Sequence, residues 1–443
     1  MGLAWCAVLW LAQILEQARQ LAWQKQFAAA EKLYRQVLRT DPASRDAKLG
    51  LGQVLLWEGR YREARQLFKT LPGAEAAEGA ATAAYWQGDY RTAAREFAAI
   101  PDRKFARQSL ADIRAVTEGD VRAAIEGVDD NQPYRAWRSS ATASMFSDPL
   151  TRWDVTAGGY SVHNIDRGVT RNEPFVMVTN ALVLPWQRLT ITSTIGALEY
   201  PDATTRPTGG IKLDRKVSGN STVTIAADHR ELLTNATAID THPSVTTLSA
   251  AWTRYVSRGW LAGVEAGHNR YFDRNDGSYI QGYALWPVFK GDATTIRAGG
   301  SAAVRNTNET RFALDAVSST LTGDFFSYSY RGSYRGYWTP IDFREARAIL
   351  SVAKTIENAE LKAQIEGGVG HDEARAFGPF AGTSPLPSNI FSFDFHRTFH
   401  PYRVAAGVSL PIATAYRLQV DLERSVTVFY AANAIRASLV RHR

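Results

Sequence analysis

The segment Leu361-Lys-Ala-Gln-Ile-Glu-Gly-Gly-Val369 alternates between apolar and polar or small residues. The segment Tyr416-Arg-Leu-Gln-Val-Asp-Leu-Glu423 repeats this pattern nearer the end of the chain. Successive side chains of a β-strand point to opposite faces of the sheet, so a period of two places the apolar residues on one face. Both segments therefore predict strands with one face suited to an apolar environment and the other face suited to water.

Similar segments recur from about residue 120 to the end of the chain, and about eighteen of them are candidate strands. Most run for about 10 to 14 residues, which is longer than a typical soluble strand and close to the length that crosses a bilayer at a tilt. Tight turns, such as those at 218–220 and 413–415, alternate with longer polar links, such as 164–173, 233–244 and 372–400. Short turns at one end and long loops at the other are typical of outer-membrane barrels. The pattern predicts an antiparallel transmembrane β-barrel of about 16 to 18 strands over residues 119–443, and losing one hairpin gives sixteen.

Composition narrows the class of protein. The 443 residues carry a formal charge of +7, without a block of clustered Lys and Arg, so no nucleic-acid partner is expected. The single cysteine, Cys6, excludes a disulfide framework and a cysteine-rich metal site. The chain has no apolar run of about 18 residues, so a membrane-spanning helix is not expected. Its apolar start, Met1 to Ala12, suits either the first helix of the next domain or a weak signal peptide, and we expect the helix.

Three stretches before residue 119 align without gaps: Trp23–Tyr34, Trp57–Phe68 and Trp86–Phe97. Trp57 follows Trp23 by 34 residues, which is the tetratricopeptide period, and Trp86 follows 29 residues later. A partial fourth helix is expected from about Phe105 to Glu118. The residues expected to pack or turn each repeat are Trp23, Phe27, Ala30, Leu51, Gly52, Trp57, Gly59, Tyr61, Ala64, Phe68, Trp86, Gly88, Tyr90, Ala93 and Phe97. The first domain, residues 1–118, thus resembles the tetratricopeptide repeats, an α-solenoid of helical hairpins. Such a surface either binds protein partners or only supports the next domain.

A tetratricopeptide solenoid followed by a barrel of about sixteen strands resembles the outer-membrane exopolysaccharide exporters. These include the C subunit of cellulose synthase operons and the poly-N-acetylglucosamine porin. The segment Gly336-Tyr-Trp-Thr-Pro-Ile-Asp-Phe343 is similar to a glycine-aromatic-x-Pro segment that precedes a late strand in the cellulose exporter. The resemblance implies a polysaccharide export channel in the outer membrane of a Gram-negative bacterium, with the solenoid in the periplasm. The smaller YaiO-type barrel is a second relative by layout, and it implies an anchor or scaffold without transport.

If the barrel forms, the polar positions of its strands line the lumen. Mixed charge signs along this path favour a neutral or weakly charged polymer, and tyrosines on the lumen side are candidates for stacking on sugar rings. The predicted lumen residues are Asp154, Tyr160, Lys212, Asp214, Asp228, Arg230, Glu265, Tyr283, Arg297, Asp315, Arg347, Lys362, Gln364, Glu366, Arg417, Gln419, Asp421 and Glu423.

Enzymatic chemistry has weaker support in the sequence. His371-Asp372-Glu373 is the most site-like triplet, yet no G-x-S-x-G motif accompanies it. A lipid-modifying enzyme is therefore the third alternative, and a non-enzymatic protein is expected. His396 and His400 are four residues apart, but Pro401 and the surrounding phenylalanines argue against a metal-binding helix. We predict no catalytic residue, no metal site and no cofactor.

Overall fold

A computed structural model describes residues 2–200, 202, 204–233, 238–256, 259–322, 325–334, 336–377, 392–427 and 430–442. Its contacts divide the chain into two compact units. The first unit contains residues 1–118 together with the short segments 146–152 and 182–189, and the second contains the remaining residues of 119–443.

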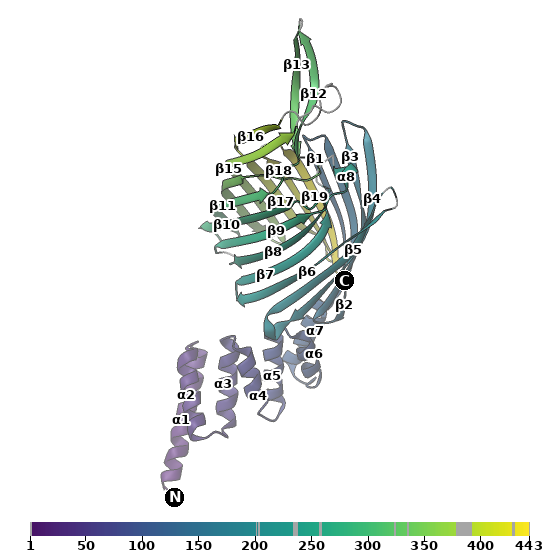
Figure 1. The fold of residues 1–443 in the computed structure, drawn as a ribbon. Coiled ribbons are helices and arrows are strands. Elements are labelled where there is room, and N and C mark those ends of the chain that lie inside the picture. Colours follow the sequence, from purple (N-terminus) through teal and green to yellow (C-terminus); the bar gives the residue numbers. More distant parts are fainter. Residues whose placement is uncertain are drawn as a thin grey trace. The chain divides into compact units, whose positions relative to one another are not determined.

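The first unit contains a series of helices that pair as hairpins (Figure 1). Among the described residues, no helix is both long enough and apolar enough to cross a membrane. The expected partial fourth helix is α7, which begins one residue earlier and ends one residue before the predicted range. The helices are α1 (Gly2–Trp23), α2 (Phe27–Thr40), α3 (Arg45–Trp57), α4 (Tyr61–Phe68), α5 (Ala74–Gln87), α6 (Tyr90–Ala98) and α7 (Lys104–Thr117).

The turns inside the repeats follow from one backbone conformation. Gly59 and Gly88 have φ angles of +77° and +86°, in the left-handed region that glycine enters without steric cost. Lys25 occupies the matching position of the first repeat, with a φ of +62°. Side chains cap two of the helices: at α3 Ser44 accepts from the Ala47 amide, and at α6 Asp89 accepts from the Thr92 amide.

Small residues let the helices of the first unit approach closely. Ala64 and Ala93 are fully buried, and Phe68 packs where a side chain at Gly52 or Gly79 would collide with its ring. Burying such apolar surface is the main source of stability for a helical hairpin that is too short to be stable alone.

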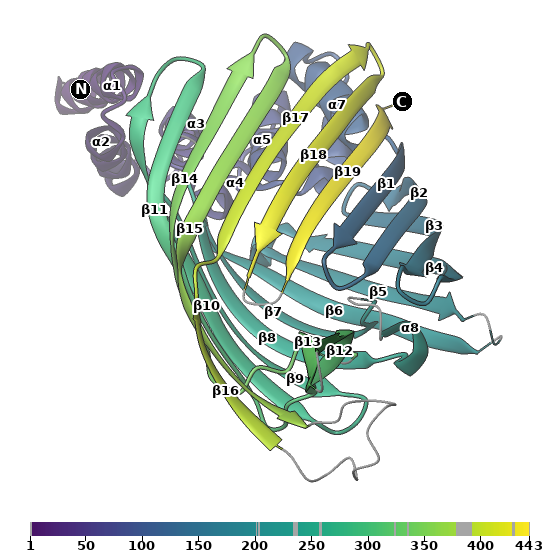
Figure 2. The ribbon, with the colours of Figure 1, turned by 90° about the horizontal axis from the view of Figure 1, so that it is seen from above.

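The main sheet of the second unit is antiparallel, and it closes because β1 pairs with both β2 and β19 (Figure 2). The wall strands are β1 (Asp120–Asp130), β2 (Tyr134–Asp148), β3 (Thr151–Asn164), β4 (Val169–Leu184), β5 (Leu189–Glu199), β6 (Thr205–Ser218), β7 (Ser221–Glu231), β8 (Ser244–Tyr255), β9 (Leu261–Tyr271), β10 (Asp276–Lys290), β11 (Thr294–Thr307), β14 (Phe343–Ile356), β15 (Ala359–Phe377), β17 (Tyr402–Ala413), β18 (Tyr416–Val426) and β19 (Ala431–His442). These sixteen strands confirm the predicted closed barrel of 16 to 18 strands.

Three further strands lie outside the closed wall. β12 (Phe312–Thr322) and β13 (Phe325–Tyr334) form their own two-stranded sheet, within the connection from β11 to β14. β16 (Ser392–Phe399) pairs with residues 370–377 of β15. The two candidate strands near 310–319 and 324–334 are therefore a hairpin, which accounts for the difference between eighteen candidates and sixteen wall strands. β16 was not among the predicted strands.

The connections at the two ends of the wall differ in length. The end at which the chain enters β1, here called the short-turn rim, has links of two to five residues between consecutive strands. The other end, the long-loop rim, carries the three longest links: 232–243, with the short helix α8 (Ala238–Thr241), 308–342 and 378–401. One predicted link is shorter than expected, because β4 already begins at Val169 and leaves only 165–168 between β3 and β4.

Candidate channel wall and loop clasp

The two faces of the wall differ in chemistry. On β15, Leu361, Ile365 and Val369 are 38%, 56% and 49% exposed, whereas Glu366 between them is 8% exposed. The same alternation holds on other strands, where Ile211, Ile225 and Ile280 are half exposed. We call the side that carries the exposed aliphatic residues the apolar face, and the opposite side the polar face.

Across β14, β15, β17 and β18 the polar face carries an ion-pair ladder of alternating sign. Arg347 contacts Glu345 at 2.6 Å and Glu366 at 3.2 Å. Arg403 continues the ladder from Glu366 at 2.7 Å to Glu423, also at 2.7 Å. Each buried charge therefore has an opposite partner on a neighbouring strand or two residues along its own strand, which offsets the cost of removing it from bulk water.

A second ladder crosses the closure of the barrel. Glu126 on β1 contacts Arg436 of β19 at 2.9 Å and Arg138 of β2 at 3.7 Å. The Arg138 guanidinium then lies 5.7 Å from the ring centre of Tyr160 and 4.9 Å from that of Phe175. The polar face thus continues from charge pairing to cation–π packing around the wall.

On β9 to β11 the polar groups surround Glu265. Tyr279 donates its hydroxyl to Glu265 at 2.7 Å, and Gln281 donates to the same carboxylate at 3.1 Å. Arg305 donates to the Gln281 oxygen at 3.2 Å, and its guanidinium lies 5.1 Å from the ring centres of both Tyr279 and Trp338. Because Trp338 belongs to the 336–343 motif, this contact places part of that motif against the polar face.

The predicted lumen residues fall into several pairs rather than one site. Lys212 pairs with Asp214 on β6, Arg230 with Asp228 on β7, and Gln419 donates to Asp421 on β18. Lys362 lies 3.4 Å from Glu360, Gln364 donates to Glu366 at 2.7 Å, and Arg417 donates to Ser409 at 2.8 Å. Arg297 is buried and donates to the Gly259 carbonyl at 3.0 Å. Asp154 lies on β3, two residues before Thr156. The Thr156 hydroxyl is hydrogen-bonded to that of Thr142 on β2.

Asp315 requires a correction. It lies on β12, in the separate hairpin, so it is not part of the barrel wall. Its side chain is outside the described residues. A period-two pattern is the same for a wall strand and for a projecting hairpin, so the sequence could not separate them.

The two tyrosines expected to stack on sugars differ in their surroundings. Tyr160 packs on Phe175 at 5.2 Å and receives Arg138, so its ring is already in contact with protein groups. Tyr283 lies over Gly263, on the same face as Gln281, and is 41% exposed. Tyr283 is therefore the better-placed ring for contact with a solute.

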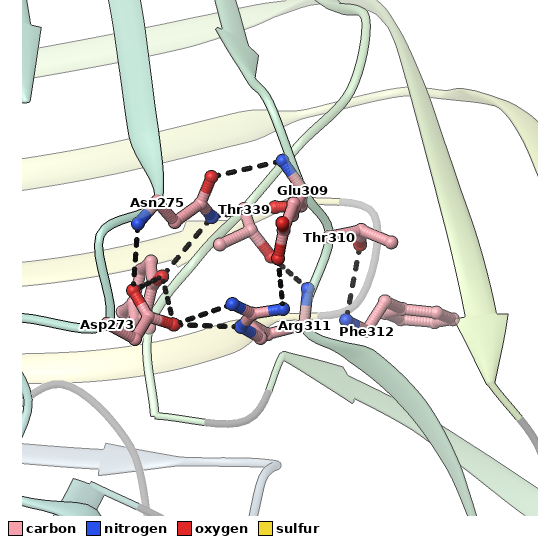
Figure 3. A network of polar contacts seen from close by, with 8 residues as sticks. Asp273, Asn275, Glu309, Thr310, Arg311, Phe312 and Thr339 are labelled. Carbon is pink, nitrogen blue, oxygen red and sulfur yellow. Dashed lines mark hydrogen bonds and ion pairs between the residues drawn. The ribbon is translucent and has the colours of Figure 1, made fainter. Parts of the chain in front are cut away.

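At the long-loop rim, hydrogen bonds join the two ends of the 308–342 connection to the loop between β9 and β10, in what we call the clasp (Figure 3). Tyr337 donates to both oxygens of Asp273, at 2.7 and 2.9 Å, and Arg311 binds the same carboxylate at 2.8 Å. Asn275 donates to the Glu309 carbonyl and accepts from the Glu309 amide. The Thr339 hydroxyl accepts from the Arg311 amide at 2.6 Å. Both ends of the 308–342 connection are thereby tied to the loop between β9 and β10.

Electrostatics strengthens the clasp at neutral pH. Burial raises the pKa of Asp273, but the hydrogen bonds from Tyr337 and Arg311 outweigh it and hold that pKa below its ordinary value. Burial and the hydrogen bond to Asp273 both raise the pKa of Tyr337. The pair is therefore a neutral phenol donating to an ionised carboxylate, a charge-assisted bond stronger than one between neutral groups.

Several residues of the ladders and the clasp were not predicted from the sequence, although the sequence pattern marks some of them. Glu345 and Arg403 occupy polar positions of alternating strands, so the period-two pattern could have included them. Asp273, Arg305 and Arg311 act through partners 24 to 64 positions away, for which no local spacing exists. The structure also brings His371 and His396 to the same carboxylate, that of Glu373.

In the helical unit, the predicted repeat residues divide between core, turn and surface. Ala30, Leu51, Gly52, Ala64, Phe68, Ala93 and Phe97 are buried, and Gly59 and Gly88 form turns. Trp23, Trp57 and Trp86 are 78%, 38% and 40% exposed, so they are not core residues. They pack at the repeat turns instead: Trp57 contacts Trp23 and Phe27, and Trp86 contacts Tyr61, while Tyr90 lies beside Tyr85.

Comparisons with known proteins support this architecture. A family model described as tetratricopeptide repeat matches residues 21–84. No curated protein matches the sequence. Among solved structures, the chain is similar to a "Bacterial polysaccharide outer membrane secretin", at 9% identity and a TM-score of 0.52, over 74% of this chain and 99% of that one. It matches CdiB from Acinetobacter baumannii at 8% identity and a TM-score of 0.41, over 73% of this chain and 60% of that one. The family model and the secretin structure support an arrangement of tetratricopeptide-like helices followed by a closed barrel with the fold of outer-membrane proteins.

Proposed function

We propose that the protein is an outer-membrane channel that exports a neutral or weakly charged polysaccharide. In this proposal the helical unit lies in the periplasm and binds proteins that make or deliver the polymer. The observation that carries the proposal is the polar face of a closed sixteen-strand wall, on which charges of both signs are paired in ladders between neighbouring strands.

The paired charges favour an uncharged polymer for a physical reason. An unpaired row of one sign would attract counter-ions or a polyelectrolyte, whereas alternating Glu345, Arg347, Glu366, Arg403 and Glu423 largely cancel one another at a distance. Their oxygens and N–H groups still offer hydrogen bonds to hydroxyl groups. The exposed ring of Tyr283 adds a flat apolar surface of the kind on which a sugar ring stacks.

Two comparisons add support. One solved structure of similar fold is a polysaccharide outer-membrane secretin, and a tetratricopeptide model matches residues 21–84 of the helical unit. The 336–343 motif, on which the likeness to the cellulose exporter rests, contacts the polar face through Trp338 and Arg305.

Single-channel recording tests the proposal. The purified protein in planar bilayers should conduct ions, and a neutral β-linked glucan should block that current in a concentration-dependent way. A polyanion of similar length, such as polygalacturonate, should block less. Tyr283→Ala should weaken the glucan block, and Ile280→Ala, on the apolar face of the same strand, should leave it unchanged. Equal block by both polymers would contradict export of a neutral chain.

One observation favours a second function, that of a membrane anchor without transport. Trp338 and Arg305 hold the 336–343 motif against the polar face. If this contact closes the barrel, the native protein has no conductance and Trp338→Ala restores it. A barrel that stays silent in both forms would favour the anchor and its helical unit as a docking platform.

A further inference from the structure

β15 and β16 form a ribbon at the long-loop rim, beyond the point where β14 ends its pairing with β15 at His371. His371 and Glu373 are two residues apart on β15, so their side chains leave the same face of the ribbon. His396 on β16 is the direct cross-strand partner of Glu373 and shares that face. Figure 2 shows β16 beside β15, at the edge of the barrel.

These three side chains converge on one point. The Nε2 atom of His371 lies 3.1 Å from Oε1 of Glu373, and Nδ1 of His396 lies 3.0 Å from the same oxygen. The three donor atoms all lie within 4.8 Å of one another. A zinc ion about 2.0 to 2.2 Å from nitrogen and oxygen ligands needs donor atoms roughly 3 to 3.5 Å apart. Two of the three separations already have this length, and the exposed His396 side chain can rotate to set the third.

The chemistry of the three donors selects the kind of metal. Two imidazoles and one carboxylate suit first-row transition metals such as Zn²⁺ and Cu²⁺, whereas Ca²⁺ and Mg²⁺ prefer oxygen ligands alone. The exposure of His396 leaves one side of the cluster open to solvent, where water completes the coordination.

We propose that His371, Glu373 and His396 form a binding site for one first-row divalent transition-metal ion. The ion joins β16 to β15 by bonds between side chains, in addition to the ladder of backbone hydrogen bonds. The main-chain oxygen of Glu373 also accepts from the Ile341 amide at 2.9 Å, so the site is fastened to the 336–343 motif as well. Metal occupancy thus stiffens the part of the rim to which the motif is bound. This role is independent of whether the barrel exports a polysaccharide.

The first test is calorimetric titration of Zn²⁺ into the full-length protein, produced without a histidine tag, folded in detergent and freed of metal with a chelator. The native protein should bind one Zn²⁺ per chain. His371→Ala and His396→Ala should each weaken binding at least about tenfold. His400→Ala removes an exposed histidine that follows β16 and should bind as the native protein does. Unchanged binding in the first two variants, or an equal loss in all three, would overturn the site.

A spectroscopic test needs no variant. Cu²⁺ bound to the native protein should give an electron paramagnetic resonance spectrum with coupling to two imidazole nitrogens. A spectrum without nitrogen coupling, or no tight binding of either metal, would show that the three residues form only a hydrogen-bonded cluster. Heat-modifiable migration on a gel confirms that each variant has folded its barrel, so a loss of binding can be assigned to the missing ligand.

Discussion

The helical unit buries its apolar side chains in its interior, whereas the barrel exposes them on its outer surface. In the helices Val54, Ala64 and Phe97 are completely buried. In the barrel Ile195, Ile365 and Leu248 are 76%, 56% and 59% exposed, while Glu366 is 8% exposed. Apolar burial drives folding in water, but in a bilayer lipid solvates the aliphatic residues and the polar groups must find partners inside. One chain therefore follows two stability rules: the helical unit is stabilised by apolar burial away from water, and the barrel by contact of its apolar face with lipid.

The largest expected effect comes from breaking the helical core. Phe68→Ala removes a ring that is 3% exposed and fills the space above Gly52 and Gly79. We expect a loss of about 3 to 5 kcal/mol in the unfolding free energy of the helices. Thermal melting followed by circular dichroism at 222 nm measures it, with Val116→Ala as the exposed control. The barrel should keep its heat-modifiable migration, and a simultaneous loss of that migration would contradict two separate stability rules.

A charge placed on either face of one barrel strand tests the second rule directly. Ile365→Arg puts a cation on the apolar face, and we expect it to destabilise the barrel by about 2 to 4 kcal/mol if the position is near the bilayer centre. Gln364→Arg, the adjacent residue on the polar face, should cost much less. Urea titrations of folding into lipid vesicles measure both. Equal costs would mean that the apolar face does not meet lipid.

The stability of the clasp should depend on pH, and the lowered pKa of Asp273 gives the direction of that dependence. Its pKa is held below the ordinary value, so its contribution to stability is present above about pH 3.9 and is lost as the pH falls through the lowered pKa. Proteolysis of the 308–342 connection should therefore be slow and constant from pH 5 to 8 and should rise only in stronger acid.

The matching variant, Asp273→Asn, removes the charged acceptor of Tyr337 and Arg311. We expect it to weaken the clasp by roughly 1 to 3 kcal/mol at pH 7, because hydrogen bonds to a charged group are replaced by weaker ones. Its proteolysis rate at pH 7 should then resemble that of the native protein in strong acid. A rate equal to the native one at pH 7 would show that other contacts hold the connection.

The smallest effect concerns the repeat turns. Lys25 adopts the left-handed conformation that Gly59 adopts in the next repeat. Lys25→Gly should stabilise the helical unit by about 0.5 to 1 kcal/mol. Gly59→Lys should destabilise it by a similar amount, since a side chain there meets only Tyr61, at 3.9 Å, and the cost is conformational. Melting temperatures that move in the same direction for both variants would refute this account.

Much of the fold could be read from local pattern. The spacing of Trp23, Trp57 and Trp86 predicted the helical hairpins, and the alternation after residue 119 predicted eighteen strands that all exist. The pattern missed β16, and it could not show that 310–334 leaves the wall as a hairpin. The cluster of His371, Glu373 and His396 was also missed, because it depends on pairing between β15 and the unpredicted β16.

Local residue patterns encode the period of each segment. A period of two or near 3.6 follows from the backbone geometry of a strand or a helix, so neighbouring residues carry the information. Folding in three dimensions sets which strands close the wall, which charges meet between strands in the ladders, and how Asp273 binds Tyr337 and Arg311. Those contacts join residues tens to hundreds of positions apart, and their partners are set by register and closure of the sheet, which no local spacing encodes.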